Sequence, residues 1–293
     1  MLQISLNELK QRLENINYVC EEDTVLTVYL ALQLQKPLLI EGAPGVGKTE
    51  MGKALAEVFD MDLIRLQCYE GLDENKALYE WNYQKQLLKI QMSKEMGQEG
   101  MSESELFTRE YLMERPLLKA ISSPEKSVLL IDEVDKCDQE FEAFLFEVLS
   151  DFQVSIPELG TVKANEVPIV VLTSNSEREL SDGLRRRCIY LYLDFPPVER
   201  EIRIINKKVS GVSQKLSEDI ARVVNALRES DLIKKKPSIA ETLDWVRALA
   251  SLEQDRLSPN LVDDSLGILL KSRRDQQAFR EEIGAQKILE NIR

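Results

Sequence analysis

The sequence predicts an α/β fold with a parallel sheet, followed by a smaller subdomain built of helices. Three observations carry this prediction. The apolar run 38–40 leads directly into a glycine-rich loop and then into a helical pattern at 50–59. Strand patterns and helical patterns then alternate as far as Leu193. Beyond Pro197 every strong pattern is helical.

The expected elements of the first part follow the chain in order. Helices are expected at 6–16, 22–35, 50–59, 108–121, 140–149 and 180–187. Strands are expected at 38–40, 63–67, 127–131, 167–173 and 189–193. Pro116 interrupts the helix expected at 108–121, and the pair Pro196-Pro197 marks the end of this part.

Two segments depart from the alternation. The segment 70–105 is less regular, and we expect it to form an insertion on the surface that carries specificity. Within it, 85–92 fits either a strand or a helix, and 97–104 is expected to be a polar loop. Farther on, 152–156 and 161–164 flank a Leu-Gly turn and predict a β-hairpin.

The part beyond Pro197 is expected to hold helices at 198–209, 217–230, 239–253 and 259–270, followed by a polar tail. A helical subdomain after an α/β core is the simplest interpretation. We therefore predict two domains, 1–196 and 197–293.

Composition restricts the chemistry and the partners. With no histidine, imidazole acid–base catalysis and most zinc-site designs are excluded. The four cysteines form no C-x-x-C pair, and no apolar run approaches a membrane span or a signal peptide, so we expect a cytoplasmic protein. The formal net charge of −13 favours a protein partner over nucleic acid.

The glycine-rich loop fits the phosphate-binding pattern G-x-x-x-x-G-K-[ST] between a strand and a helix. Its residues are Gly42, Ala43, Pro44, Gly45, Val46, Gly47, Lys48 and Thr49, and Glu50 continues into the helix. Such a loop wraps backbone N–H groups around phosphate oxygens, the lysine reaches the β and γ phosphates, and the hydroxyl ligates Mg²⁺. The alternative, a chance glycine-rich turn, does not account for the strand and helix on either side.

A second acidic motif follows the strand 127–131. Asp132, at the strand's carboxyl end, is expected to hold Mg²⁺, and Glu133 to polarise the water that attacks the γ phosphate. Alone, the pair equally fits an ordinary acidic loop, but after a phosphate loop the catalytic interpretation is favoured. Asp135 and Lys136 are expected at the surface or at an interface.

Two further sites are weaker signals. Asn175 ends the strand 167–173, where its amide is placed to contact the attacking water or the γ phosphate, although a turn asparagine is the ordinary alternative. Arg185, Arg186 and Arg187 end a short helix. They fit a solvated face, or one or two of them reach the γ phosphate of a neighbouring subunit.

These motifs, in this order, resemble those of AAA+ ATPases. Five stretches narrow the resemblance to the MoxR family and its branch similar to the CoxD protein of carbon monoxide dehydrogenase maturation. The stretches are 65–72, 77–81, 132–136, 152–160 and 236–245.

The resemblance implies an αβα nucleotide-binding core, a helical lid and a homo-oligomeric ring, typically a hexamer. It also implies that ATP and Mg²⁺ are the cofactors. Arg187 takes the arginine-finger position, with Arg186 second, and Asn175 takes the sensor-1 position. MoxR-like ATPases are thought to act as chaperones in enzyme maturation or metal insertion, often with a protein that carries a von Willebrand factor A domain.

One position departs from the family pattern. Ser238 to Glu241 stand where relatives carry a sensor-2 arginine, and Lys235, Lys236 and Arg247 are the candidates to replace it.

Three hypotheses follow from these observations. The first is an ATPase that remodels a protein client. The second is a nucleotide-gated scaffold with little turnover, and the third is a nucleic-acid motor, which the acidic charge disfavours. A GTPase is not supported, because the chain has no Asn-Lys-x-Asp motif.

Overall fold

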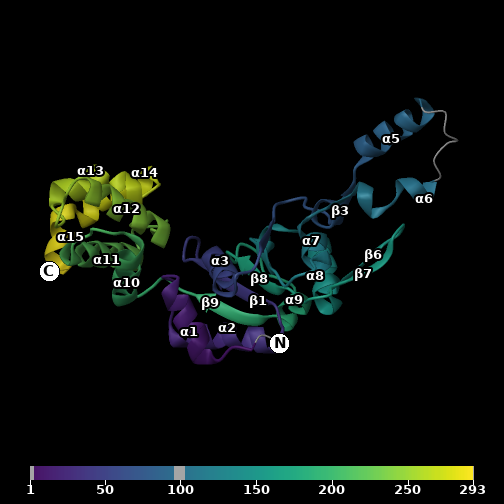
Figure 1. Cartoon of the computed structure of the whole chain (residues 1–293). Coiled ribbons are helices and arrows are strands. Elements are labelled where there is room, and N and C mark those ends of the chain that lie inside the picture. The colour runs from purple at the N-terminus through teal and green to yellow at the C-terminus, as the bar shows by residue number, and fades with distance from the viewer. Residues whose placement is uncertain (1–2, 96–102, 293) are drawn as a thin grey trace. The chain divides into compact units, whose positions relative to one another are not determined.

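The chain is described by a computed structural model that covers residues 3–95 and 103–292 (Figure 1). Contacts divide the chain into two compact units. Unit 1 consists of Met1–Leu9, Asp23–Glu41 and Lys48–Tyr192, and unit 2 of Lys10–Glu22, Gly42–Gly47 and Leu193–Arg293. The expected domain boundary between 196 and 197 stays a prediction. No helix in the described part of the chain has the length and apolar character that crossing a membrane requires.

Unit 1 is built around a five-stranded sheet in the order β2-β5-β8-β1-β9. Its strands are β1 (Leu38–Gly42), β2 (Leu63–Gln67), β5 (Val128–Asp132), β8 (Ile169–Ser174) and β9 (Ile189–Leu193). The pairs β2–β5, β5–β8 and β1–β8 are parallel. The three central strands are buried along their whole length, as parallel strands covered on both faces are. The predicted α/β fold class is confirmed.

Helices cover both faces of this sheet. The helices of unit 1 that surround it include α2 (Glu22–Leu34), α3 (Lys48–Phe59), α7 (Pro116–Ser122), α8 (Gln139–Asp151) and α9 (Asp182–Arg187), and α1 (Leu6–Asn15) precedes them. Leu130 of β5 lies against Gly52 of α3, where an added Cβ would stand 3.0 Å from a leucine methyl. Leu129 and Ile131, which alternate with Leu130 along β5, belong to the apolar cluster that contains Leu117 of α7. Neighbouring residues of β5 therefore contact helices on opposite faces of the sheet. Unit 1 thus has three layers, with the sheet between two layers of helices.

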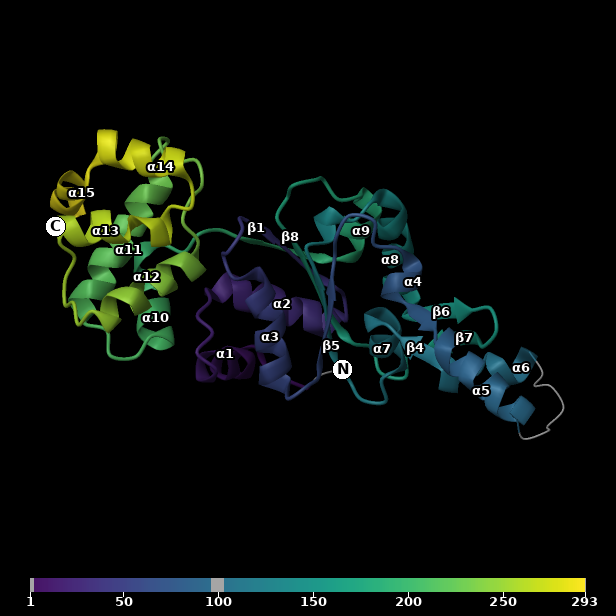
Figure 2. The same cartoon turned by 90° about the horizontal axis from the view of Figure 1, so that it is seen from above.

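An arm extends from unit 1 between β2 and α7 (Figure 2). It contains α4 (Glu74–Ala77), β3 (Tyr79–Trp81), α5 (Tyr83–Glu95), α6 (Glu103–Leu106), a 3₁₀ turn (Arg109–Tyr111) and β4 (Leu112–Glu114). The strands β3 and β4 pair antiparallel at its base. The undecided segment 85–92 is therefore helical, and most of the expected loop 97–104 lies outside the described residues.

The helix expected at 108–121 is wrong in its first half. A 3₁₀ turn and β4 occupy 109–114, and α7 begins only at Pro116. Proline disfavours the helical conformation in the residue before it and is well placed at the first helical position, so Pro116 starts a helix and does not interrupt one. The expected hairpin is confirmed as β6 (Gln153–Ile156) and β7 (Gly160–Lys163).

Unit 2 contains α10 (Val198–Lys208), α11 (Gln214–Glu229), α12 (Ile239–Ser251) and α13 (Pro259–Leu269), close to their expected bounds. The prediction of a polar tail after residue 270 is wrong, because this segment is folded. It folds into α14 (Arg273–Ala278), a π-helical turn (Phe279–Ile283) and α15 (Ala285–Ile292). Phe279, Ile288 and Leu289 enter the same apolar core as Trp245, because the tail's apolar residues recur at helical spacing.

Candidate functional site

The phosphate loop joins β1 to the start of α3. All three of its glycines have positive φ angles, +155° at Gly42, +76° at Gly45 and +101° at Gly47. At Gly42 an added Cβ would stand 2.1 Å from the Leu193 carbonyl oxygen, so both the conformation and the space require glycine. At Gly47 an added Cβ would meet nothing within 4 Å, so the backbone is open there. The loop is followed directly by α3 at Lys48, and the positive end of a helix dipole suits an anion.

Lys48 and Asn175 meet across 127 positions of sequence. Lys48 is buried, and its Nζ donates to the Asn175 Oδ1 at 2.8 Å. Burial lowers the pKa of the Lys48 ammonium, while nearby carboxylates, that of Asp135 first, oppose the shift. The lysine predicted to reach phosphate and the amide predicted to contact the γ phosphate are thus adjacent.

Thr49 and Asp132 are also brought together. The Thr49 hydroxyl donates to the Asp132 Oδ1 at 2.9 Å, and the Thr173 hydroxyl donates to the same oxygen at 2.5 Å. A hydroxyl and a carboxylate oxygen suit a hard cation such as Mg²⁺. Within the described residues no group of three or more metal-ligating side chains occurs. One hydroxyl and one carboxylate are a protein ligand set that suits Mg²⁺, which commonly keeps several waters and binds substrate phosphates.

Glu133 adopts an uncommon backbone conformation. Its φ and ψ are 58° and 50°, the left-handed region, and its N–H donates to the Thr173 hydroxyl at 2.9 Å. Its carboxylate accepts from the Gln67 Nε2 at 3.0 Å and from the Lys136 Nζ at 2.7 Å. Both donors contact the same oxygen, Oε2, so the predicted catalytic carboxylate is held on one side.

Three polar residues of the site were not predicted from the sequence: Arg65, Gln67 and Thr173. Arg65 and Gln67 alternate on the exposed side of β2, and Gln67 is in register with Asp132 on β5. The sequence did contain a signal for Arg65 and Gln67, because polar residues at every second position of a strand share one face of the sheet. Their partners could not be known until β2 and β5 were paired.

Asp135 was expected at the surface or at an interface, but the structure buries it. Asp135 is 4% exposed, and its Oδ2 accepts from the backbone N–H groups of Asn175 and Glu177 at 3.1 and 3.0 Å. Its carboxylate fixes the turn after β8, because two backbone donors need a buried acceptor there. Lys136 is partly exposed and pairs with Glu133.

The three arginines at the end of α9 have different surroundings. The Arg185 Nη2 donates to the Glu41 Oε2 at 3.1 Å and its guanidinium lies 5.4 Å from the centre of the Tyr190 ring. Arg187 is exposed and lies 4.8 Å from the centre of the Phe146 ring, at an open groove of about 530 Å³. Arg186 is exposed. In the part of the chain that the structure describes, neither Arg186 nor Arg187 is paired with Asp132 or Glu133.

The position expected to carry a sensor-2 arginine is occupied by a helix cap. Ser238 caps α12 in a capping box with Glu241. Within unit 2, an added Cβ on Gly45 would lie 2.2 Å from the Ser238 Cβ. Of the candidate replacements, the Lys236 Nζ donates to the Ser230 carbonyl and Arg247 pairs with Asp244.

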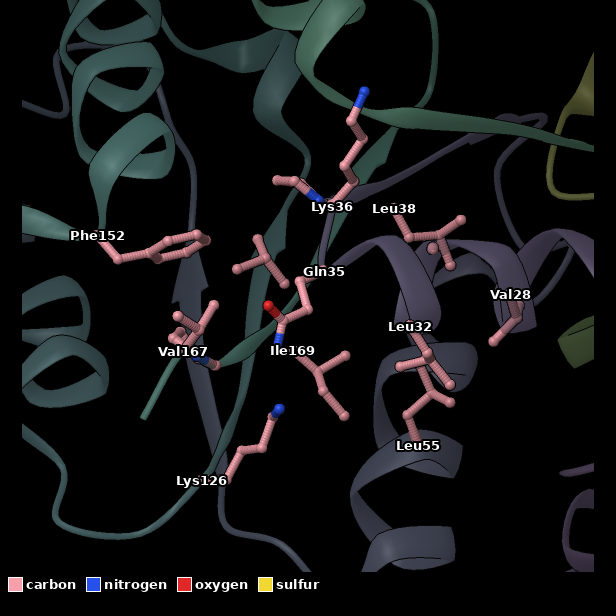
Figure 3. Close-up of a pocket in the computed structure, with 14 residues that line it drawn as sticks. Val28, Leu32, Gln35, Lys36, Leu38, Leu55, Lys126, Phe152, Val167 and Ile169 are labelled. Atoms are coloured by element: carbon pink, nitrogen blue, oxygen red, sulfur yellow. The ribbon is translucent and has the colours of Figure 1, made fainter. Parts of the chain in front are cut away.

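A small apolar cavity lies at the opposite end of the strands (Figure 3). Its volume is about 20 Å³, and it lies among Leu32, Leu38, Phe152 and Ile169. That space holds about one water molecule. Ligands of open α/β sheets bind at the carboxyl ends of the strands, so this cavity is not the nucleotide site.

Comparisons with known proteins agree with this geometry. The family model for the AAA domain of the dynein-related subfamily matches residues 37–188. The gas vesicle ATPase GvpN1 of Halobacterium salinarum is 23% identical over 262 residues, which cover 86% of this chain and 74% of that protein. An uncharacterised protein of Staphylococcus saprophyticus is 25% identical over 249 residues, which cover 81% and 85%.

Solved structures share the fold. The RuvB Holliday junction branch migration motor of Thermotoga maritima aligns with a TM-score of 0.51 at 17% identity, over 88% of this chain and 72% of that chain. A mutant of the same RuvB aligns with a TM-score of 0.51 at 19% identity, over 93% and 73%. At this level of identity the likeness concerns the fold alone.

Proposed function

This chain belongs to the AAA family of ATPases, in its dynein-related subfamily, and on that basis we propose that it hydrolyses ATP with Mg²⁺ to remodel or mature a protein client. The observation that carries the proposal is the meeting of four side chains at the carboxyl edge of the sheet. Lys48 contacts Asn175, and Thr49 contacts Asp132.

Each side chain has a role in this proposal. Lys48 and Asn175 bind the phosphates, and the loop 42–50 provides backbone donors. Thr49 and Asp132 hold Mg²⁺, which neutralises charge on the phosphates when it is bound. Glu133 orients the water that attacks the γ phosphate, and Gln67 and Lys136 hold its Oε2.

Assembly and client are the finer parts of the proposal. Arg186 and Arg187 are both exposed at the end of α9. Arg187, with Arg186 as the second candidate, is proposed to reach the nucleotide of a neighbouring subunit in a homo-oligomeric, hexameric ring. Similarity to a gas vesicle ATPase and the MoxR-like motifs support a chaperone for assembly of a metalloenzyme or other complex. A partner with a von Willebrand factor A domain fits that role, and the charge of −13 disfavours nucleic acid.

Variants of this site test the proposal. Glu133→Gln should bind ATP and lose hydrolysis by about a hundredfold or more, because only the water-orienting carboxylate is removed. Lys48→Ala should lose ATP binding, and Arg187→Ala should keep binding and lose hydrolysis. Single-turnover hydrolysis and binding of a fluorescent ATP analogue separate these outcomes. Unchanged hydrolysis in Glu133→Gln would contradict the assigned role, and negligible turnover in the unmutated ring would favour the nucleotide-gated scaffold.

A further inference from the structure

Arg65 lies beside Asp132, the proposed metal ligand, and contacts it directly. It stands on β2, an edge strand of the sheet, where alternate side chains are exposed. Its backbone is in register with Leu130, two positions before Asp132. A long side chain at this position reaches along the sheet toward the carboxyl end of β5.

The guanidinium of Arg65 makes two contacts there. Its Nη2 donates to the Asp132 Oδ2 at 2.5 Å and to the Gln67 Oε1 at 2.7 Å. Arg65 is 49% exposed, whereas Asp132 is only 3% exposed. The cation is therefore free to move into solvent, and the carboxylate is not.

The contacts of Asp132 divide between its two oxygens. Oδ1 accepts from the neutral hydroxyls of Thr49 and Thr173, and Oδ2 accepts from Arg65. A buried carboxylate needs a nearby positive charge, because hydroxyl donors satisfy its lone pairs without balancing its charge. Arg65 is the cation in direct contact with Asp132, and the Lys48 ammonium is close enough to interact with the same carboxylate.

We propose that Arg65 is a positioning residue that balances the charge of Asp132 before the metal arrives and competes with Mg²⁺ for that carboxylate. This inference rests on the proposed function, since Asp132 is there a magnesium ligand. Two cations on one carboxylate repel each other, and the half-exposed guanidinium is the one that can withdraw into water at low cost. Arg65 therefore sets the Mg²⁺ concentration at which the site fills.

The withdrawal has a second consequence at the same site. Gln67 accepts from Arg65 through its Oε1 and donates to Glu133 through its Nε2. When Arg65 leaves Asp132, the amide loses a fixed partner on one side. Filling of the metal position is thereby linked to the freedom of the catalytic carboxylate.

The test is a Mg²⁺ titration of Arg65→Gln, read by binding of a fluorescent ATP analogue and not by hydrolysis. The half-saturating Mg²⁺ concentration should fall by about threefold to fivefold, because a competing partner of ordinary ion-pair strength is removed. Binding of the analogue in EDTA should not change. Mg²⁺ also binds the free analogue, but equally in the titrations of the unmutated protein and of Arg65→Gln. The difference between their half-saturating Mg²⁺ concentrations therefore reports the effect of Arg65.

Arg115→Gln is the matched control. Arg115 makes an ion pair of the same length, 2.5 Å, with Glu80 in the arm, and both partners are about half exposed. Its removal should leave the Mg²⁺ titration unchanged. A titration of Arg65→Gln that is unchanged, or that needs more Mg²⁺, would overturn the inference. Weaker binding in EDTA would overturn it as well, because Arg65 would then be a phosphate ligand.

A double variant confines the effect to Asp132. In the Asp132→Asn background, Arg65→Gln should cause no further shift, since the neutral amide neither holds the arginine nor attracts Mg²⁺. A shift of the same size in both backgrounds would refute competition at Asp132. Failure of the unmutated protein to bind the analogue in a Mg²⁺-dependent way would instead refute the proposed function.

Discussion

Each unit contains a buried carboxylate that pairs with an arginine, and the pairs of Asp132 and Glu201 differ in how completely they are enclosed. In unit 1, Asp132 is 3% exposed and Arg65 is 49% exposed. In unit 2, Glu201 is 0% exposed and Arg228 is 5% exposed. Arg228 donates to both oxygens of Glu201, at 2.6 and 2.9 Å, and its Nε donates to the Pro237 carbonyl at 2.8 Å. Its guanidinium also lies 4.6 Å from the centre of the Phe195 ring.

The comparison separates a structural ion pair from an exchangeable one. Arg228 is held by two-pronged geometry and by neighbours on several sides, so neither partner can leave without exposing a buried charge. Arg65 has one short contact to Asp132 and an open path to water. A buried carboxylate at a ligand site needs the second arrangement, because its partner must give way to the ligand.

The largest effect on stability is expected from breaking the enclosed pair. Arg228→Met should lower the free energy of unfolding by about 3–5 kcal/mol, because Glu201 is left buried without a counter-charge. Arg65→Met should cost less, about 1–3 kcal/mol, because the Lys48 ammonium remains close to Asp132. Urea unfolding followed by circular dichroism measures both. Equal losses in the two variants would abolish the distinction.

A smaller effect is expected among the arginines of α9. Arg185→Ala should cost about 1–3 kcal/mol, because Glu41, which is 6% exposed, loses its cationic partner. Arg186→Ala, one position on, is the control and should change stability by less than about 0.5 kcal/mol, since Arg186 is exposed. Thermal unfolding compares the two. A larger loss in Arg186→Ala would show that the wrong arginine has been taken as structural.

The smallest effect is expected in the arm. Leu88 of α5 is 61% exposed, and Tyr83, Leu87 and Met92 on the same helix are each more than half exposed. Leu88→Ala should change the free energy of unfolding by about 0.5 kcal/mol or less. The matched Leu249→Ala, in the core of unit 2 and 0% exposed, should cost about 2–5 kcal/mol. A similar cost at both leucines would mean that α5 is packed in solution.

Local pattern was sufficient where a feature depends on neighbours in sequence. The strand, the glycine-rich loop and the following helix at 38–59 could be predicted together, because the loop needs glycine conformations and the strand and helix have their own periodicities. The same holds for the hairpin 152–164. Local pattern failed at 109–114, where pairing with β3 decides the conformation, and at Asp135, which looked like a surface residue.

The sequence by itself determined the fold class, the family resemblance and the acids and lysine of the candidate site, because each lies in a short motif with its own spacing. Only the tertiary structure decided what those groups contact. Asp132 meets Arg65, Glu133 meets Gln67, and Lys48 meets Asn175. These contacts depend on strand order and register in the sheet, which join residues far apart in the chain and leave no periodic signal. The enclosure that makes Arg228 structural and Arg65 exchangeable is likewise a property of packing.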